Sequence, residues 1–169
     1  MNYAFLVTQL EQHARAIQAM TRGISADNAR WKPGAEAWSI LEVVNHLYDE
    51  ERRDFRVRLD IILHRPHEAF PHINPPQWVI DEKYNERDLE ASLQNFLDER
   101  ANSLRWLSGF APFNQDASLT NEFGTVTAGE MFCAWVAHDV LHLRQLVELH
   151  YALVTQHAAP FILEYAGAW

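Results

Sequence analysis

Apolar residues recur at helical spacing in several long stretches of this chain. In the first stretch, from about Tyr3 to Arg22, one stripe alternates spacings of three and four residues; its members are Leu6, Leu10, His13, Ile17 and Met20. Such spacing keeps the side chains on one face of an α-helix. The stretch therefore predicts an amphipathic helix that carries one histidine on its buried face.

The second predicted helix begins at a capping box. Glu42 follows Ser39 by three residues, and the two side chains can satisfy free backbone N–H groups at a helix start. The sequence WSILEVVNHLYDEERRDF then continues to about His64, where the proline-rich stretch RPHEAFPHINPPQW cannot extend a helix. This stretch predicts a long connection across one end of a bundle.

Two further helices are predicted in the second half of the chain. The first spans about 86–108, and Arg100 lies on its apolar stripe, whose other members are Leu89, Leu93, Phe96, Leu104 and Leu107. The second follows another capping box, formed by Thr127 and Glu130, and continues to about Thr155. The segment between these helices is predicted to be irregular, with LTNEFGTVT extended.

These elements predict an all-α fold, a four-helix bundle with long connections. Long connections permit a topology other than plain up-and-down. A chain of 169 residues suits one domain with a full hydrophobic core, and the sequence contains no repeat, low-complexity tract or interdomain linker. We therefore expect residues 1–169 to form a single domain.

Charge and cysteine content narrow the classes of partner and site. A net charge of −9 gives no attraction to phosphate backbones or anionic lipid, so neither nucleic acid nor a membrane is an expected partner. The single cysteine, Cys133, excludes an intrachain disulfide and a cysteine-rich zinc site, and we expect it to be packed and inert. The chain has no signal-like leader and no membrane-length apolar run, so we expect a cytoplasmic protein.

The histidines are the candidate chemistry. His138 and His142 are four residues apart on the buried stripe of the last helix, and His46 lies near the buried edge of the second. Residues at i and i+4 are separated by only about 40° around a helix, so both imidazoles can converge on one ion. A three-histidine set would leave ligand positions open, as in catalytic zinc sites. The alternative is a set of hydrogen-bonded core histidines without metal.

Acidic residues flank these histidines. Asp139 turns about 100° away from His138, which favours a role as an interhelical or outer partner. Asp49 and Glu50 share the face of His46 and could bond its imidazole or the ion, although a solvated acidic patch, YDEERRD, is the favoured interpretation.

Other polar and aromatic residues could complete a pocket. Arg100 must find a carboxylate or carbonyl inside the bundle, and an ion pair with Asp54 or a neighbouring acid is favoured over an anionic ligand. Trp135 stands one turn before His138 and could wall the pocket, while His13 could line it or lie at the core's rim. Surface exposure or helix-end interactions suffice for the remaining histidines, His64, His67, His72, His150 and His157.

Three strings, in order, carry a family resemblance: WSILEVVNHL, WVIDEKYNERDLEASLQNFLDERANSL and AGEMFCAWVAHDVLHLRQL. Together they resemble the DinB/YfiT-like superfamily over nearly the whole chain. The resemblance implies a four-helix bundle that binds a divalent ion, with His46, His138 and His142 as ligands. It also implies a homodimer. Three imidazoles suit Zn²⁺ or Ni²⁺ best.

The resembled family includes thiol-dependent enzymes, such as bacillithiol S-transferases and mycothiol-dependent maleylpyruvate isomerases. We therefore expect a metal-dependent thiol S-transferase or hydrolase with a small-molecule substrate and, for a transferase, a low-molecular-weight thiol. The alternative is a non-catalytic metal- or ligand-binding stress-response module. A diiron site of the ferritin type is excluded, because none of the nine histidines follows a glutamate by three residues.

Overall fold

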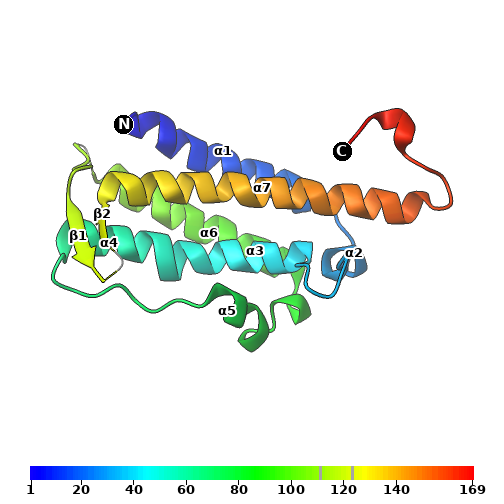
Figure 1. The fold of residues 1–169 in the computed structure, drawn as a ribbon, viewed down its shortest axis with the longest axis horizontal. Coiled ribbons are helices and arrows are strands. Elements are labelled where there is room, and N and C mark those ends of the chain that lie inside the picture. Colours follow the sequence, from blue (N-terminus) through cyan, green and yellow to red (C-terminus); the bar gives the residue numbers. More distant parts are fainter. Residues whose placement is uncertain (111, 123) are drawn as a thin grey trace.

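The computed structural model describes residues 1–110, 112–122 and 124–169, and it shows a four-helix bundle (Figure 1). Its helices are α1 (Tyr3–Thr21), the continuous α3 (Ile40–Asp49), η1 (Glu50–Phe55) and α4 (Arg56–His64), then α6 (Leu89–Ser108) and α7 (Ala128–Ala158). The segment η1 is π-helical, so one wide turn interrupts the second helix without ending it. The predicted all-α bundle is confirmed.

The helices do not alternate plainly up and down. Figure 1 shows α1 and α7 running one way and α3–α4 and α6 running the other. Helix α6 packs against both α1 and α3, and α7 packs against the same two helices from the other side. The connection that follows α4 returns along the bundle through α5 (Pro75–Asp81) and η2 (Tyr84–Glu86), which explains how two successive long helices can be parallel.

Local capping fixes most helix starts. Both predicted capping boxes form, at Ser39 with Glu42 and at Thr127 with Glu130. Helix α6 begins three residues later than the predicted Glu86, because the Asp88 side chain accepts the N-terminal backbone bond. The short helix α2 (Ala26–Arg30) was not predicted, since five residues are too few to show a period.

A small hairpin closes one end of the bundle. Strand β1 (Ser118–Asn121) pairs antiparallel with β2 (Gly124–Thr127), which agrees with the extended structure predicted for this segment. Phe123, within the predicted extended segment, and Ala111, in the predicted irregular one, lie outside the described residues. The 3-10 turn η3 (Glu164–Ala166) lies in the C-terminal tail.

The buried interior has two apolar clusters with polar residues between them. The cluster near the hairpin includes Leu10, Phe55, Leu107 and Trp135, and the cluster near α2 includes Ala14, Leu47, Phe96 and Leu146. Along α7, for example, His138, Asp139 and His142 come after the first cluster's Trp135 and before the second cluster's Leu146. The candidate site therefore lies in a polar layer across the middle of the bundle.

One packing expectation is wrong. Cys133 is exposed rather than packed, and its Sγ lies 3.5 Å from Sδ of Met1, just before α1. Among the described helices, none is long and apolar enough to cross a membrane.

Candidate metal centre

Three histidine side chains from two helices meet inside the bundle. His46 comes from α3, and His138 and His142 come from successive turns of α7. The Nε2 atom of His138 lies 3.4 Å from Nε2 of His46 and 3.1 Å from Nε2 of His142. One nitrogen of each ring lies within 4.8 Å of the others, a spacing that could hold one metal ion.

The two separations that involve His138 fit a tetrahedral ligand set. Zinc–nitrogen bonds of about 2.05 Å at tetrahedral angles place two ligand nitrogens about 3.3 Å apart. The observed separations of 3.1 and 3.4 Å bracket that value. Lone pairs of two neutral imidazoles repel at such a distance unless a proton or a cation lies between them. The donor set therefore fits a divalent ion.

Burial keeps this cluster uncharged at neutral pH. Burial, together with the two neighbouring histidines, lowers the pKa of His46 to about 2. Burial likewise lowers the pKa of His138 to about 4 and that of His142 below its ordinary value. Neutral imidazoles present lone pairs and no competing positive charge, which is the state that binds metal.

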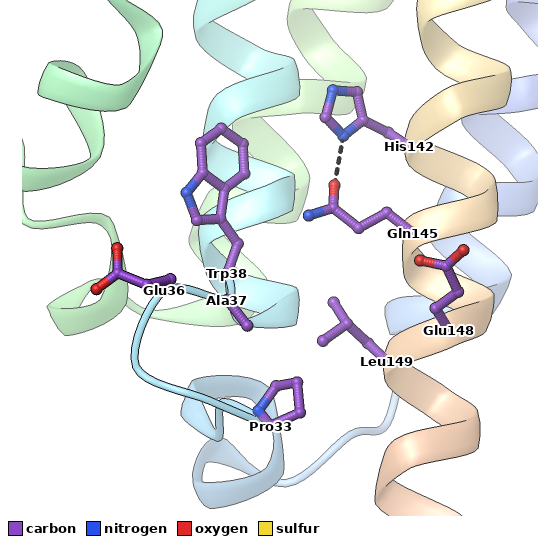
Figure 2. A pocket seen from close by; sticks show the side chains of 8 residues that line it. All are labelled: Pro33, Glu36, Ala37, Trp38, His142, Gln145, Glu148 and Leu149. Atoms are coloured by element: carbon purple, nitrogen blue, oxygen red, sulfur yellow. Dashed lines mark hydrogen bonds between the residues drawn. The ribbon is translucent and has the colours of Figure 1, made fainter.

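A hydrogen bond orients His142. Its Nδ1 lies 2.8 Å from Oε1 of Gln145, three residues later on the same helix face (Figure 2). With Nδ1–H donated to that oxygen, the Nε2 lone pair faces the other two histidines. The sequence analysis missed Gln145; its i+3 spacing from His142 was the available signal.

Glu50 lies near the Nδ1 atom of His46, as Gln145 lies near the Nδ1 atom of His142. Its Oε1 is 3.7 Å from Nδ1 of His46, and both atoms are buried without a hydrogen-bond partner among the described residues. Burial, with repulsion from Asp54, raises the pKa of Glu50 well above its ordinary value. Glu50 is thus aimed at the imidazole edge that faces away from the other histidines.

The expected solvated acidic patch is wrong. Asp49, Glu50 and Glu51 are 0%, 4% and 1% exposed, because the connection through α5 and η2, α7, and α6 cover three sides of this helix. Asp49 accepts bonds from Tyr84 and Arg52, so it is directed away from the histidine cluster.

Arg100 is almost fully buried, and the predicted ion pair forms with Glu51, a neighbouring acid, and with Asp139 rather than with Asp54. Its Nε donates to Glu51 at 2.7 Å, and its two terminal nitrogens donate to Asp139 at 2.7 and 2.9 Å. Nη1 also donates to the Leu10 carbonyl at 2.7 Å. Asp54 pairs with Arg58 instead, one turn further along its own helix. Arg100 therefore joins all sides of the bundle and is not available to a substrate.

The remaining predicted pocket residues belong to this network. His13 Nδ1 lies 3.3 Å from Asp139, and the Trp135 indole N–H donates to Glu51 at 2.8 Å. Asp139 faces Arg100, although it directly follows His138. None of these side chains points into the cluster of His46, His138 and His142.

A pocket of about 400 Å³ opens beside His142 (Figure 2). The apolar side of its wall comes from the loop before α3 and from the next turns of α7: Pro33, Ala37, Trp38 and Leu149. Its polar lining consists of His142, Gln145, Glu36 and Glu148. The Trp38 and His142 rings are parallel within 3°. Trp38, rather than the predicted Trp135, walls the pocket.

Comparisons with known proteins agree with this fold. A family model of the DinB superfamily matches residues 9–146. Among solved structures, YfiT from Bacillus subtilis is similar over 89% of this chain and 87% of its own, with a TM-score of 0.78 and 14% identity. YfiT is described as a probable metal-dependent hydrolase with an unusual four-helix bundle topology. A comparison with curated protein sequences found no match.

Proposed function

Because this chain belongs to the DinB superfamily, we propose that it is a divalent-metal-dependent hydrolase of a small molecule, with His46, His138 and His142 as metal ligands. The observation that carries the proposal is the meeting of three Nε2 atoms at ligand spacing beside an open pocket. The description of YfiT as a probable metal-dependent hydrolase supports it.

The residues of this chain have distinct tasks in such a site. The three imidazoles offer neutral nitrogen donors, and Gln145 fixes the orientation of one of them. Trp38 and Leu149 give the pocket an apolar wall that excludes water from one side of a bound molecule. A divalent ion, zinc or nickel by the chemistry of three imidazoles, supplies Lewis acidity that polarises a carbonyl and acidifies water.

Elemental analysis of the purified protein tests the metal assignment. We expect about one equivalent of divalent metal per chain in the wild type, lost in His46→Ala and in His142→Ala. His64→Ala is the matched control, because His64 is exposed and pairs with Asp60 outside the cluster. Absence of metal from the wild type, even after titration with Zn²⁺ and Ni²⁺, would refute the proposal.

Turnover tests the reaction class. We expect metal-loaded protein to hydrolyse activated esters or amides, with loss of activity on chelation and recovery on adding metal back. The same substrates and electrophilic acceptors are then assayed with added low-molecular-weight thiols. Turnover that requires a thiol would assign an S-transferase instead, and stoichiometric metal without any turnover would assign a non-catalytic binding module.

A further inference from the structure

We propose that Gln145 serves both partners of the reaction: its carbonyl oxygen positions His142, and its NH₂ group donates a hydrogen bond to a neutral carbonyl substrate. The substrate class is a carboxylic amide or ester with an apolar substituent, bound in the pocket beside His142. This inference rests on the proposed hydrolase function and deepens it.

The orientation of the Gln145 amide follows from the chemistry of His142. A neutral imidazole that offers its Nε2 lone pair to a metal carries its proton on Nδ1. That proton needs an acceptor, and the Gln145 oxygen lies 2.8 Å from Nδ1. Since the oxygen faces His142, the amide nitrogen must face elsewhere.

Figure 2 shows where that nitrogen points. The Gln145 NH₂ group extends from α7 toward Trp38, across the pocket that Pro33 and Leu149 close below. Among the described residues, none accepts a hydrogen bond from it. Two N–H donors are therefore presented to a ligand at the side of the pocket nearest the histidines.

The lining indicates which ligands fit. Pro33, Ala37, Trp38 and Leu149 supply apolar contact, and the ionisable lining groups other than His142 are the carboxylates Glu36 and Glu148. The described lining contains no lysine or arginine. In the metal-free protein an anionic ligand would find no cationic partner in this lining and would meet like charge, whereas a neutral carbonyl needs only the amide donor. The metal-free pocket therefore favours amides and esters over carboxylates.

The donor would act where charge develops. In hydrolysis the water oxygen bonds to the carbonyl carbon, the C–N or C–O bond breaks, and the two water protons end on the carboxylic acid and the leaving amine or alcohol. The carbonyl oxygen gains negative charge as the water adds, and an N–H donor already aimed at it stabilises that charge. The expected role of Gln145 is therefore larger in turnover than in substrate binding.

Two substitutions separate the roles of the amide. Gln145→Glu keeps an oxygen acceptor for His142 but removes the N–H donors, whereas Gln145→Leu removes both. We expect zinc affinity to stay within about threefold of wild type in Gln145→Glu and to fall roughly 10- to 100-fold in Gln145→Leu. We expect kcat to fall about tenfold or more in Gln145→Glu at saturating zinc. Gln156→Glu, exposed on the same helix, is the matched control.

Binding to the zinc-free protein tests the substrate class without turnover. The probes are phenylacetamide and its anionic isostere phenylacetate, and the readout is the NMR side-chain amide signal of Gln145, identified by its absence in Gln145→Glu. We expect phenylacetamide to shift this signal saturably, phenylacetate to leave it unmoved, and Gln145→Glu to weaken phenylacetamide binding roughly five- to tenfold, as followed by the Trp38 indole signal.

The outcomes distinguish this inference from the proposed function. If the wild type binds zinc and hydrolyses esters but Gln145→Glu matches it in kcat and in phenylacetamide binding, the inference is wrong and the hydrolase stands. Equal loss of zinc in Gln145→Glu and Gln145→Leu would likewise overturn the two-role assignment, as would preferential binding of phenylacetate. If the wild type binds no metal, the proposed function itself fails.

Discussion

Replacing Arg100 with methionine would test the idea that a buried charge holds the bundle together around the candidate site. The guanidinium is 1% exposed and donates to Glu51, Asp139 and the Leu10 carbonyl. Methionine is apolar and extends about as far as the arginine Nε, so it keeps the packing of the aliphatic stem without restoring any of these bonds. The substitution therefore leaves two buried carboxylates without their cation.

The two carboxylates are left in unequal positions. Glu51 keeps bonds from the Ser103 hydroxyl at 2.6 Å and the Trp135 indole at 2.8 Å. Among the residues that the structure describes, Asp139 keeps only His13, at 3.3 Å. Removing one partner of a buried pair costs about 3–5 kcal/mol, because the remaining charge stays desolvated. We expect a loss in this range for Arg100→Met at neutral pH, most of it from Asp139.

A double substitution isolates that contribution. Asp139→Asn removes the stranded charge while nearly preserving its shape, so we expect Arg100→Met with Asp139→Asn to be more stable than Arg100→Met alone. Two residues in direct contact give non-additive changes of this kind. Additive losses would mean that the Arg100–Asp139 contact contributes little.

The pH dependence of the difference has a definite sign. In the wild type, burial raises the pKa of Asp139, but Arg100 and His13 together outweigh burial and hold it below its ordinary 3.8. Asp139 therefore stabilises the wild type above that pH, and the contribution fades as pH falls. Without Arg100, burial raises the folded-state pKa above 3.8, so Asp139 destabilises the variant more as pH rises. The difference between the two proteins should grow from about pH 4 toward neutrality.

Urea unfolding of metal-free protein, followed by circular dichroism between pH 4 and 7.5, measures these differences. Arg105→Met is the matched control, because Arg105 lies on the same helix and is exposed; it should change stability by about 0.5 kcal/mol or less. A loss below about 1 kcal/mol for Arg100→Met, or a loss that does not increase with pH, would refute the reasoning.

Three further changes probe other parts of the fold. Glu50→Gln removes a carboxyl group whose pKa is raised by burial, Asp54 and Asp49 against the opposing effect of Arg58, so the metal-free wild type loses stability as pH rises above 4.5. In urea titrations with a chelator present, the free energy of unfolding of the variant should therefore rise relative to that of the wild type as pH increases, and a constant difference would contradict this. Tyr84→Phe deprives buried Asp49 of a hydroxyl donor, so thermal unfolding should show a loss of about 1–3 kcal/mol, and an unchanged midpoint would count against a role for that bond. Removing residues 159–169, none of them buried, should lower the free energy of unfolding by about 1 kcal/mol or less. A larger loss of stability would show that the tail packs on the bundle, and a lower mass of the truncated protein in sedimentation would place the tail at a subunit contact.

Local signals predicted the framework of this fold well. The two capping boxes and the periodic stripes depend on neighbours within one or two turns, so the sequence contains them explicitly. Predicting that His46 meets His138 and His142 required one further assumption, that the buried faces of their two helices oppose each other. Their service as metal ligands stays a prediction.

The sequence analysis could not predict which distant segments cover a given residue. The acidic run around Glu50 has a composition typical of solvated surface, and it is buried only because a distant connection and two helices cover it. The partners of Arg100 could not be selected among several acids by periodicity, since the π-helical turn at η1 changes which acid faces α6. The pocket beside His142 depends on the loop carrying Trp38, whose position no period predicts.

The polar layer explains how the site can be ordered before any metal binds. His138 and Asp139 are consecutive on α7, about 100° apart, so one faces the histidine cluster while the other faces Arg100. Sliding α7 by one turn would move both by about 5.4 Å and break the two-point contact with Arg100. The register that satisfies the buried charges is therefore the register that brings His138 and His142 to His46. Burying these charges costs desolvation free energy, but their pairing fixes the register of α7, the helix that carries two of the three imidazoles.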